Sequence, residues 1–120
     1  MRVKNNVPRA RKKRRIRKAA KGGVGGRSKL LRTAKETIAR SMRYAYVGRK
    51  ERKRDFRRLW IERINAAARM RGVTYSVFMG GLIKAGVEVD RRAMADLAVT
   101  DPGAFDRLIE VSKEALSAEA

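Results

Sequence analysis

Two clusters of basic side chains are the residues of this sequence best suited to binding anions. Residues 9–18 hold eight Lys or Arg in ten positions, and residues 49–58 hold seven. Arg binds phosphate oxygens through paired hydrogen bonds, whereas Lys acts as a point charge. The whole chain has 32 Lys and Arg against 12 Asp and Glu, a net charge of +20 and a pI near 11.5. These features predict a polyanionic partner, and nucleic acid is the favoured class.

Several side chains that enzymes commonly use are missing from this chain of 120 residues. It has no Cys and no His, which excludes disulfides, thiolate nucleophiles, most zinc sites and the usual general base. Four glycines between residues 22 and 26 do not match a nucleotide-binding P-loop, because no Lys-Ser or Lys-Thr follows at the required spacing. We therefore expect no enzymatic activity, no metal site, no cofactor and no small-molecule substrate.

Positive charge is concentrated in one half of the chain. Residues 1–60 carry 24 Lys and Arg against three acids, whereas residues 61–120 carry eight against nine. This asymmetry predicts a basic extension over residues 1–58 and a neutral globular domain over residues 59–120. No run of 18 apolar residues and no secretory h-region is present. We therefore expect a cytoplasmic protein without a membrane partner.

The extension is predicted to contain a helix, a glycine hinge and a second, long helix. Residues 7–21 begin with Pro8 and consist mainly of good helix formers, but like charges four residues apart repel one another. We expect this segment to be disordered when free and helical when bound. Residues 30–71 lack Pro and end before Gly72, which predicts one helix about 60 Å long.

The remaining residues predict three short helices, so the fold class is all-α. Thr74, Asp90 and Asp101 stand at N-cap positions, and Pro102 occupies the first turn of the last helix. Together with the end of the long helix they form a small four-element domain. Its expected inward side chains are Phe56, Trp60, Ile64, Ala67, Tyr75, Phe78, Met79, Leu82, Ile83, Met94, Leu97, Ala98, Phe105, Leu108, Ile109 and Leu116.

Two tyrosines in the long helix are further candidates for binding. Tyr44 and Tyr46 are two residues apart, so they cannot both face one core. One of them is available to stack on a base or ribose, although a simply exposed or half-buried tyrosine is an equal alternative. The helix after Asp90 offers only Arg91 and Arg92 near its start, which disfavours sequence-specific DNA reading by a helix-turn-helix. Together with Lys84, these two arginines remain candidates for contact with a phosphate or an RNA helix groove.

The second basic cluster leads into a recognisable sequence. Residues 53–69, KRDFRRLWIERINAAAR, closely resemble the signature of the bacterial large-subunit ribosomal protein family numbered twenty, and the resemblance continues through residues 44–46, 84–91 and 95–102. It implies a basic extension threaded into large-subunit ribosomal RNA, a small helical C-terminal domain, neighbouring ribosomal proteins as partners and a role in early subunit assembly. In several bacteria the C-terminal domain of this family also represses its own messenger RNA.

Two positions depart from the family pattern. Gly23 stands where an aromatic residue is common, so that RNA contact there depends on backbone and charge. Glu62 replaces a small or apolar residue; it either pairs with Arg58 or Arg69 or marks a position facing solvent.

The candidate binding residues are taken from the extension. We predict that the following side chains contact ribosomal RNA: Arg2, Lys4, Arg9, Arg11, Lys12, Lys13, Arg14, Arg15, Arg17, Lys18, Lys21, Arg27, Ser28, Lys29, Arg32, Arg43, Tyr44, Arg49, Lys50, Arg52, Lys53, Arg54, Arg57 and Arg58. Two rival functions share the basic composition. A DNA-compacting protein would bind duplex DNA equally well, and a membrane-surface helix would need an apolar face, which residues 9–18 lack.

Overall fold

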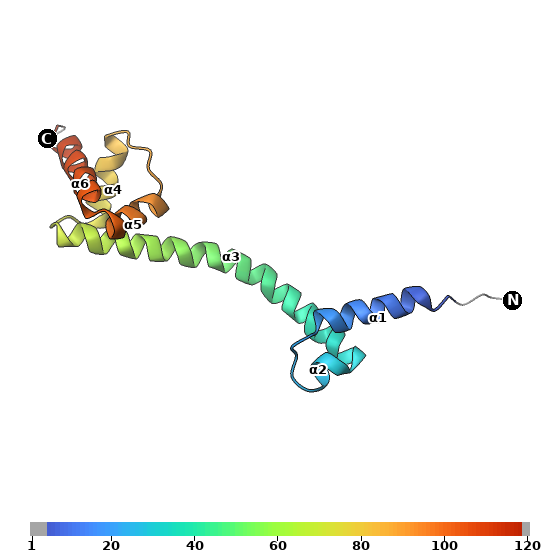
Figure 1. The fold of residues 1–120 in the computed structure, drawn as a ribbon. Helices are drawn as coiled ribbons and strands as arrows, with labels where there is room; N and C mark the ends of the chain where they lie inside the picture. Colours follow the sequence, from blue (N-terminus) through green and yellow to red (C-terminus); the bar gives the residue numbers. More distant parts are fainter. Residues whose placement is uncertain (1–4, 119–120) are drawn as a thin grey trace. The chain divides into compact units, whose positions relative to one another are not determined.

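The computed structural model describes residues 5–118, and this part of the chain contains six helices and no strand (Figure 1). The all-α fold class is therefore confirmed. The chain divides into two compact units that meet between Glu51 and Arg52, within one continuous helix. The predicted boundary between residues 58 and 59, as the limit of an independently folding domain, stays a prediction.

The first unit begins with α1 (Val7–Ala19). Pro8 lies in the first turn, where its missing N–H removes no helical hydrogen bond, and the Asn5 side-chain oxygen accepts a hydrogen bond of 3.0 Å from the Val7 amide. Arg17 and Lys18 in the last turn favourably face the negative end of the helix dipole. The predicted helix is thus present, whereas its disorder in the free chain stays a prediction.

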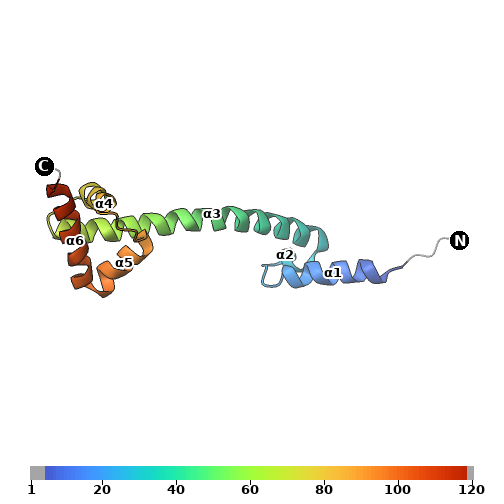
Figure 2. The same ribbon diagram turned by 90° about the horizontal axis from the view of Figure 1, so that it is seen from above.

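A glycine-rich turn joins α1 to the rest of this unit through the single turn of α2 (Gly26–Lys29). Gly22 and Gly25 have positive φ angles of 91° and 62°, which reverse the chain. Figures 1 and 2 both show α1 lying beside the start of the long helix α3, which begins at Leu31. Ala20 and Ala34 are buried where these segments meet.

The long helix α3 (Leu31–Met70) has 40 residues and agrees with the prediction to within one residue at each end. Gly48 does not interrupt it, and Gly72, with a φ of 72°, follows its end. Every residue from 39 to 59 is exposed. Side-chain packing within the chain therefore contributes little to this stretch of the helix.

The second unit packs the end of α3 against α4 (Tyr75–Lys84), α5 (Arg91–Thr100) and α6 (Pro102–Ser117). Two predicted caps are confirmed: the Asp90 carboxylate accepts a hydrogen bond of 2.7 Å from the Ala93 amide, and Asp101 accepts one of 3.0 Å from Ala104. Thr74 also stands at an N-cap, but its side chain makes no capping hydrogen bond.

All four helices contribute to one core in this unit. The rings of Phe78 and Phe105 lie 5.3 Å apart, centroid to centroid, in a tilted arrangement. Trp60 is half-buried and packs against this core, as predicted. The buried core residues are Ile64, Ala67, Ala68, Val73, Phe78, Leu82, Met94, Ala95, Phe105 and Ile109.

Two residues predicted to face inward are exposed instead. Phe56 is 42% exposed: it lies one turn before Trp60 and contacts that ring at 6.2 Å without joining the core. Ile83 is 73% exposed because its neighbour Leu82 takes the inward position, and adjacent helical residues point about 100° apart. The spacing of apolar residues alone overestimated the width of the buried face.

Arg71 joins the end of α3 to the start of α6. Its guanidinium donates to the backbone oxygens of Ala67 at 2.9 Å and Pro102 at 3.3 Å, forms an ion pair with Asp106, and lies 5.1 Å from the centre of the Phe105 ring. This arginine therefore stabilises the packing of α3 against α6, unlike the exposed arginines of the first unit.

Candidate nucleic-acid interface

The cations of α1 are exposed and unpaired. Its eight Lys and Arg side chains are exposed, except for half-buried Lys13. None of them forms an ion pair with another described residue; Arg32–Glu36, Arg58–Asp55 and Arg71–Asp106 are ion pairs elsewhere in residues 5–118. Positive charge without acidic partners creates a field that attracts phosphate groups.

A cationic groove lies between α1 and the start of α3. Arg9, Lys12 and Lys13 line one side, and Lys35 lines the other, around a cavity of about 250 Å³. Ile16 and Leu31 complete the lining, and no acidic side chain takes part. Lys35 was not among the predicted binding residues, because nothing in its local sequence shows that α1 lies beside it.

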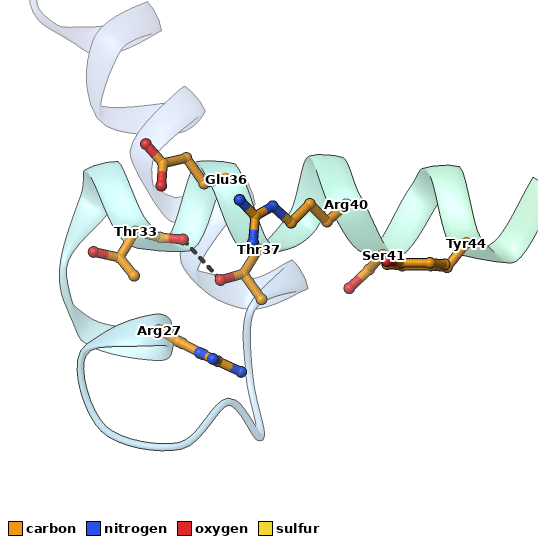
Figure 3. Close-up of a pocket in the computed structure, with 7 residues that line it drawn as sticks. All are labelled: Arg27, Thr33, Glu36, Thr37, Arg40, Ser41 and Tyr44. Carbon is orange, nitrogen blue, oxygen red and sulfur yellow. Dashed lines mark hydrogen bonds between the residues drawn. The ribbon is translucent and has the colours of Figure 1, made fainter.

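A second hollow lies between α2 and α3 in the same unit (Figure 3). Its cavity of about 410 Å³ brings together two predicted residues, Arg27 and Tyr44, that are 17 positions apart in the sequence. Arg40, an isolated basic residue that the sequence analysis passed over, also lines it. The remaining lining residues are Thr33, Glu36, Thr37 and Ser41.

The basic cluster of residues 49–58 occupies consecutive turns of α3, and all its members are exposed. Three of its cations make local contacts. Lys50 donates a hydrogen bond of 2.7 Å to the Tyr46 hydroxyl, Arg52 lies 5.6 Å from the centre of the Phe56 ring, and Arg58 forms an exposed ion pair of 3.6 Å with Asp55. Such exposed contacts are weak, so these cations remain available to a stronger anionic partner.

The second unit carries a smaller basic hollow that includes Arg92, named above as a candidate for phosphate contact, and Arg63, which was not predicted. Arg63 and Arg92 line it with Trp60, Ala95 and Asp96 around about 200 Å³. Arg91, beside Arg92, instead donates a hydrogen bond of 3.1 Å to the Tyr75 hydroxyl. The structure thus assigns different surroundings to two adjacent arginines that the sequence could not distinguish.

Most of the 24 predicted RNA-binding residues lie within the part of the chain that the structure describes. Arg2 and Lys4 lie outside the described residues. The other 22 candidates are exposed, except for half-buried Lys13 and Ser28. Glu62 is also exposed and forms no ion pair, which favours the solvent-facing alternative for that position. Contact of these side chains with RNA stays a prediction.

Metal-binding clusters and membrane-spanning helices are both absent from residues 5–118. No group of three or more Asp or Glu side chains in this range is arranged to hold a metal ion. Within the same range no helix combines the length and the apolar composition needed to cross a bilayer.

The fold and these surfaces define a small, basic, all-helical protein, and comparison with known proteins specifies its family. The family model described as Ribosomal protein L20 matches residues 2–108. The large ribosomal subunit protein bL20 of Desulfosudis oleivorans is 53% identical, with 95% of this chain and 98% of the relative covered. The protein of the same name from Clostridium botulinum strain Hall is 48% identical, with 98% of each covered.

The chain belongs to the ribosomal protein L20 family. This membership confirms the family resemblance of residues 53–69 and makes the chain a ribosomal protein of the large subunit. It also agrees with the predicted cytoplasmic location, since bacterial ribosomes are cytoplasmic.

Proposed function

We propose that this protein binds large-subunit ribosomal RNA directly, mainly through phosphates, and has a structural role without catalysis. The observation that carries the proposal is the set of unpaired, exposed cations on α1 and the groove that Lys35 completes. Neutralisation of phosphates by Lys and Arg releases counterions, and this release drives binding irrespective of sequence. Neighbouring ribosomal proteins are the further expected partners.

The exposed middle of α3 supports the same proposal. Residues 39–59 are all exposed, whereas a helix in water gains most of its stability from packing. Repulsion between like charges further weakens this helix and α1 when the chain is free. Bound RNA would neutralise these charges and order both segments, and the ordered chain would then hold RNA segments together early in subunit assembly.

Ultraviolet crosslinking in growing cells tests this proposal. The RNA attached to the chain is sequenced and the crosslinked residues are mapped. We expect crosslinks at a few positions of large-subunit ribosomal RNA, made by residues before Arg63. Crosslinks spread over many transcripts, or recovery mainly of DNA, would contradict the proposal and favour a general polyanion-binding protein.

A charge variant tests the proposed role in assembly. Arg14 and Arg15 are exposed on α1, and both are replaced by Gln. The matched control replaces Arg107 and Lys113, two exposed cations of α6, by Gln as well. In cells that depend on the variant, the α1 substitutions should lower the share of complete large subunits in a sucrose gradient and increase early precursors. Equal profiles for the two variants would contradict a special role of α1.

Repression of its own messenger RNA is a finer part of the proposal. The hollow lined by Arg63, Arg92 and Trp60 supports it, because it offers the second unit a cationic surface of its own. Overproduction of the chain should reduce a reporter fused to its own messenger leader, and Arg92→Gln should weaken that reduction. An unchanged reporter would show that repression does not operate in this protein.

A further inference from the structure

The two exposed tyrosines of α3 have different surroundings. Tyr46 is already engaged: its hydroxyl accepts a hydrogen bond of 2.7 Å from the Lys50 ammonium, which also lies 4.3 Å from the centre of the ring. Tyr44 is 74% exposed, has no such partner and lines the hollow between α2 and α3. Of the two aromatic rings, only that of Tyr44 lines this hollow.

The hollow has a size and shape that suit a single nucleotide. Its volume of about 410 Å³ falls within the range of small-ligand sites, roughly 300–1,000 Å³. Figure 3 shows Arg27 reaching from α2 toward the same hollow that Thr37, Ser41 and Tyr44 line from α3. One wall therefore supplies a guanidinium and the other supplies hydroxyls and an aromatic ring.

The charges of the lining leave a net attraction for phosphate. Arg27 and Arg40 are cationic, whereas Glu36 is the one acid in the lining. Arg32, outside the hollow, forms an ion pair of 3.6 Å with Glu36 and offsets its charge. The Thr37 hydroxyl donates 2.8 Å to the Thr33 carbonyl, and its oxygen remains able to accept a hydrogen bond from a base.

We propose that this hollow holds one unstacked nucleotide of the bound RNA, with the base against the Tyr44 ring and a phosphate on the Arg27 guanidinium. The inference rests on the proposed function and specifies what this part of the first unit binds. Bases inside an RNA duplex are stacked on one another, so an aromatic side chain contacts the face of a base only in a loop, a bulge or a single strand. A stacking residue beside an arginine therefore selects an extruded nucleotide over a paired one.

The test compares the full-length chain on two short RNA hairpins that differ only by one unpaired adenosine in the stem. We expect the bulged hairpin to bind about tenfold more tightly at a fixed salt concentration, as one base–aromatic stack would give. Tyr44→Leu should abolish this preference, so that the variant binds the two hairpins equally. Tyr44→Trp should preserve the preference, because it keeps an aromatic face.

Tyr46→Leu is the matched control, since it removes the second exposed tyrosine of α3, which does not line the hollow. This variant should retain the full preference. Equal, salt-sensitive binding of both hairpins by the unmodified chain would overturn the nucleotide site and leave the proposed function standing. Loss of preference in both tyrosine variants would also overturn the site. Failure to bind either hairpin even at low salt would overturn the proposed function itself.

Discussion

At the scale of single residues, Gly81 of α4 lies directly against Ser112 of α6. A Cβ atom at this position would overlap the side-chain and backbone oxygens of Ser112. Ser112 is itself only 1% exposed, and its hydroxyl donates a hydrogen bond of 2.9 Å to the Phe78 carbonyl. The glycine therefore allows two helices to share a buried hydrogen bond.

Gly81→Ala should lower the free energy of unfolding by about 1–3 kcal/mol, because the added methyl group must displace α6 backbone. Gly80→Ala is the matched control. A Cβ there meets no other atom within 4 Å, so it should raise stability by about 0.5–1 kcal/mol through helix propensity. Urea unfolding of both variants, followed by circular dichroism, measures the difference. Equal effects would show that the helices move apart without cost.

At the scale of helices, two N-cap positions differ in whether the side chain takes part. The Asp101 carboxylate accepts a hydrogen bond from the Ala104 amide at the start of α6. Thr74, at the start of α4, makes no corresponding bond. Asp101→Ala should therefore lower the free energy of unfolding by about 1 kcal/mol, whereas Thr74→Ala should change it by only a few tenths. A larger loss from the Thr74 variant would contradict the assigned caps.

The location of the core predicts that residues 59–120 fold as a separate fragment. Every residue in or against the core of the second unit, from Trp60 to Ile109, lies after residue 58. A chain of residues 59–120 should therefore be soluble, helical by circular dichroism and cooperative in thermal unfolding. Because a domain of this size buries only about 60% of its unfolded surface, its stability should be modest. An unfolded fragment would show that the domain requires the extension or the RNA.

At the scale of the whole molecule, the excess of positive charge governs binding. If the chain neutralises six to ten phosphates, its affinity for ribosomal RNA should fall by about 10³ to 10⁵ between 50 and 200 mM salt. Residues 59–120, which are nearly neutral overall, should show a much smaller dependence. Filter binding over a salt series measures both slopes. A flat response of the full chain would contradict binding through phosphates.

The sequence by itself determined the longer helices, the uneven charge and the family, but not the single turn of α2. Pro8, Gly72, Asp90 and Asp101 mark helix ends because they act on the backbone within one turn of themselves. The excess of basic residues in the first half is likewise a property of composition. Such local signals do not depend on how the helices pack, and they can therefore be recognised in the sequence alone.

Only the tertiary structure decided which side chains meet across helices. It placed Lys35 beside α1, Arg40 and Tyr44 beside Arg27, and Gly81 against Ser112. It also left Ile83 exposed where spacing predicted burial. The physical reason is that these contacts join residues distant in sequence, so they depend on how helices cross, whereas helix periodicity specifies only which residues share a face.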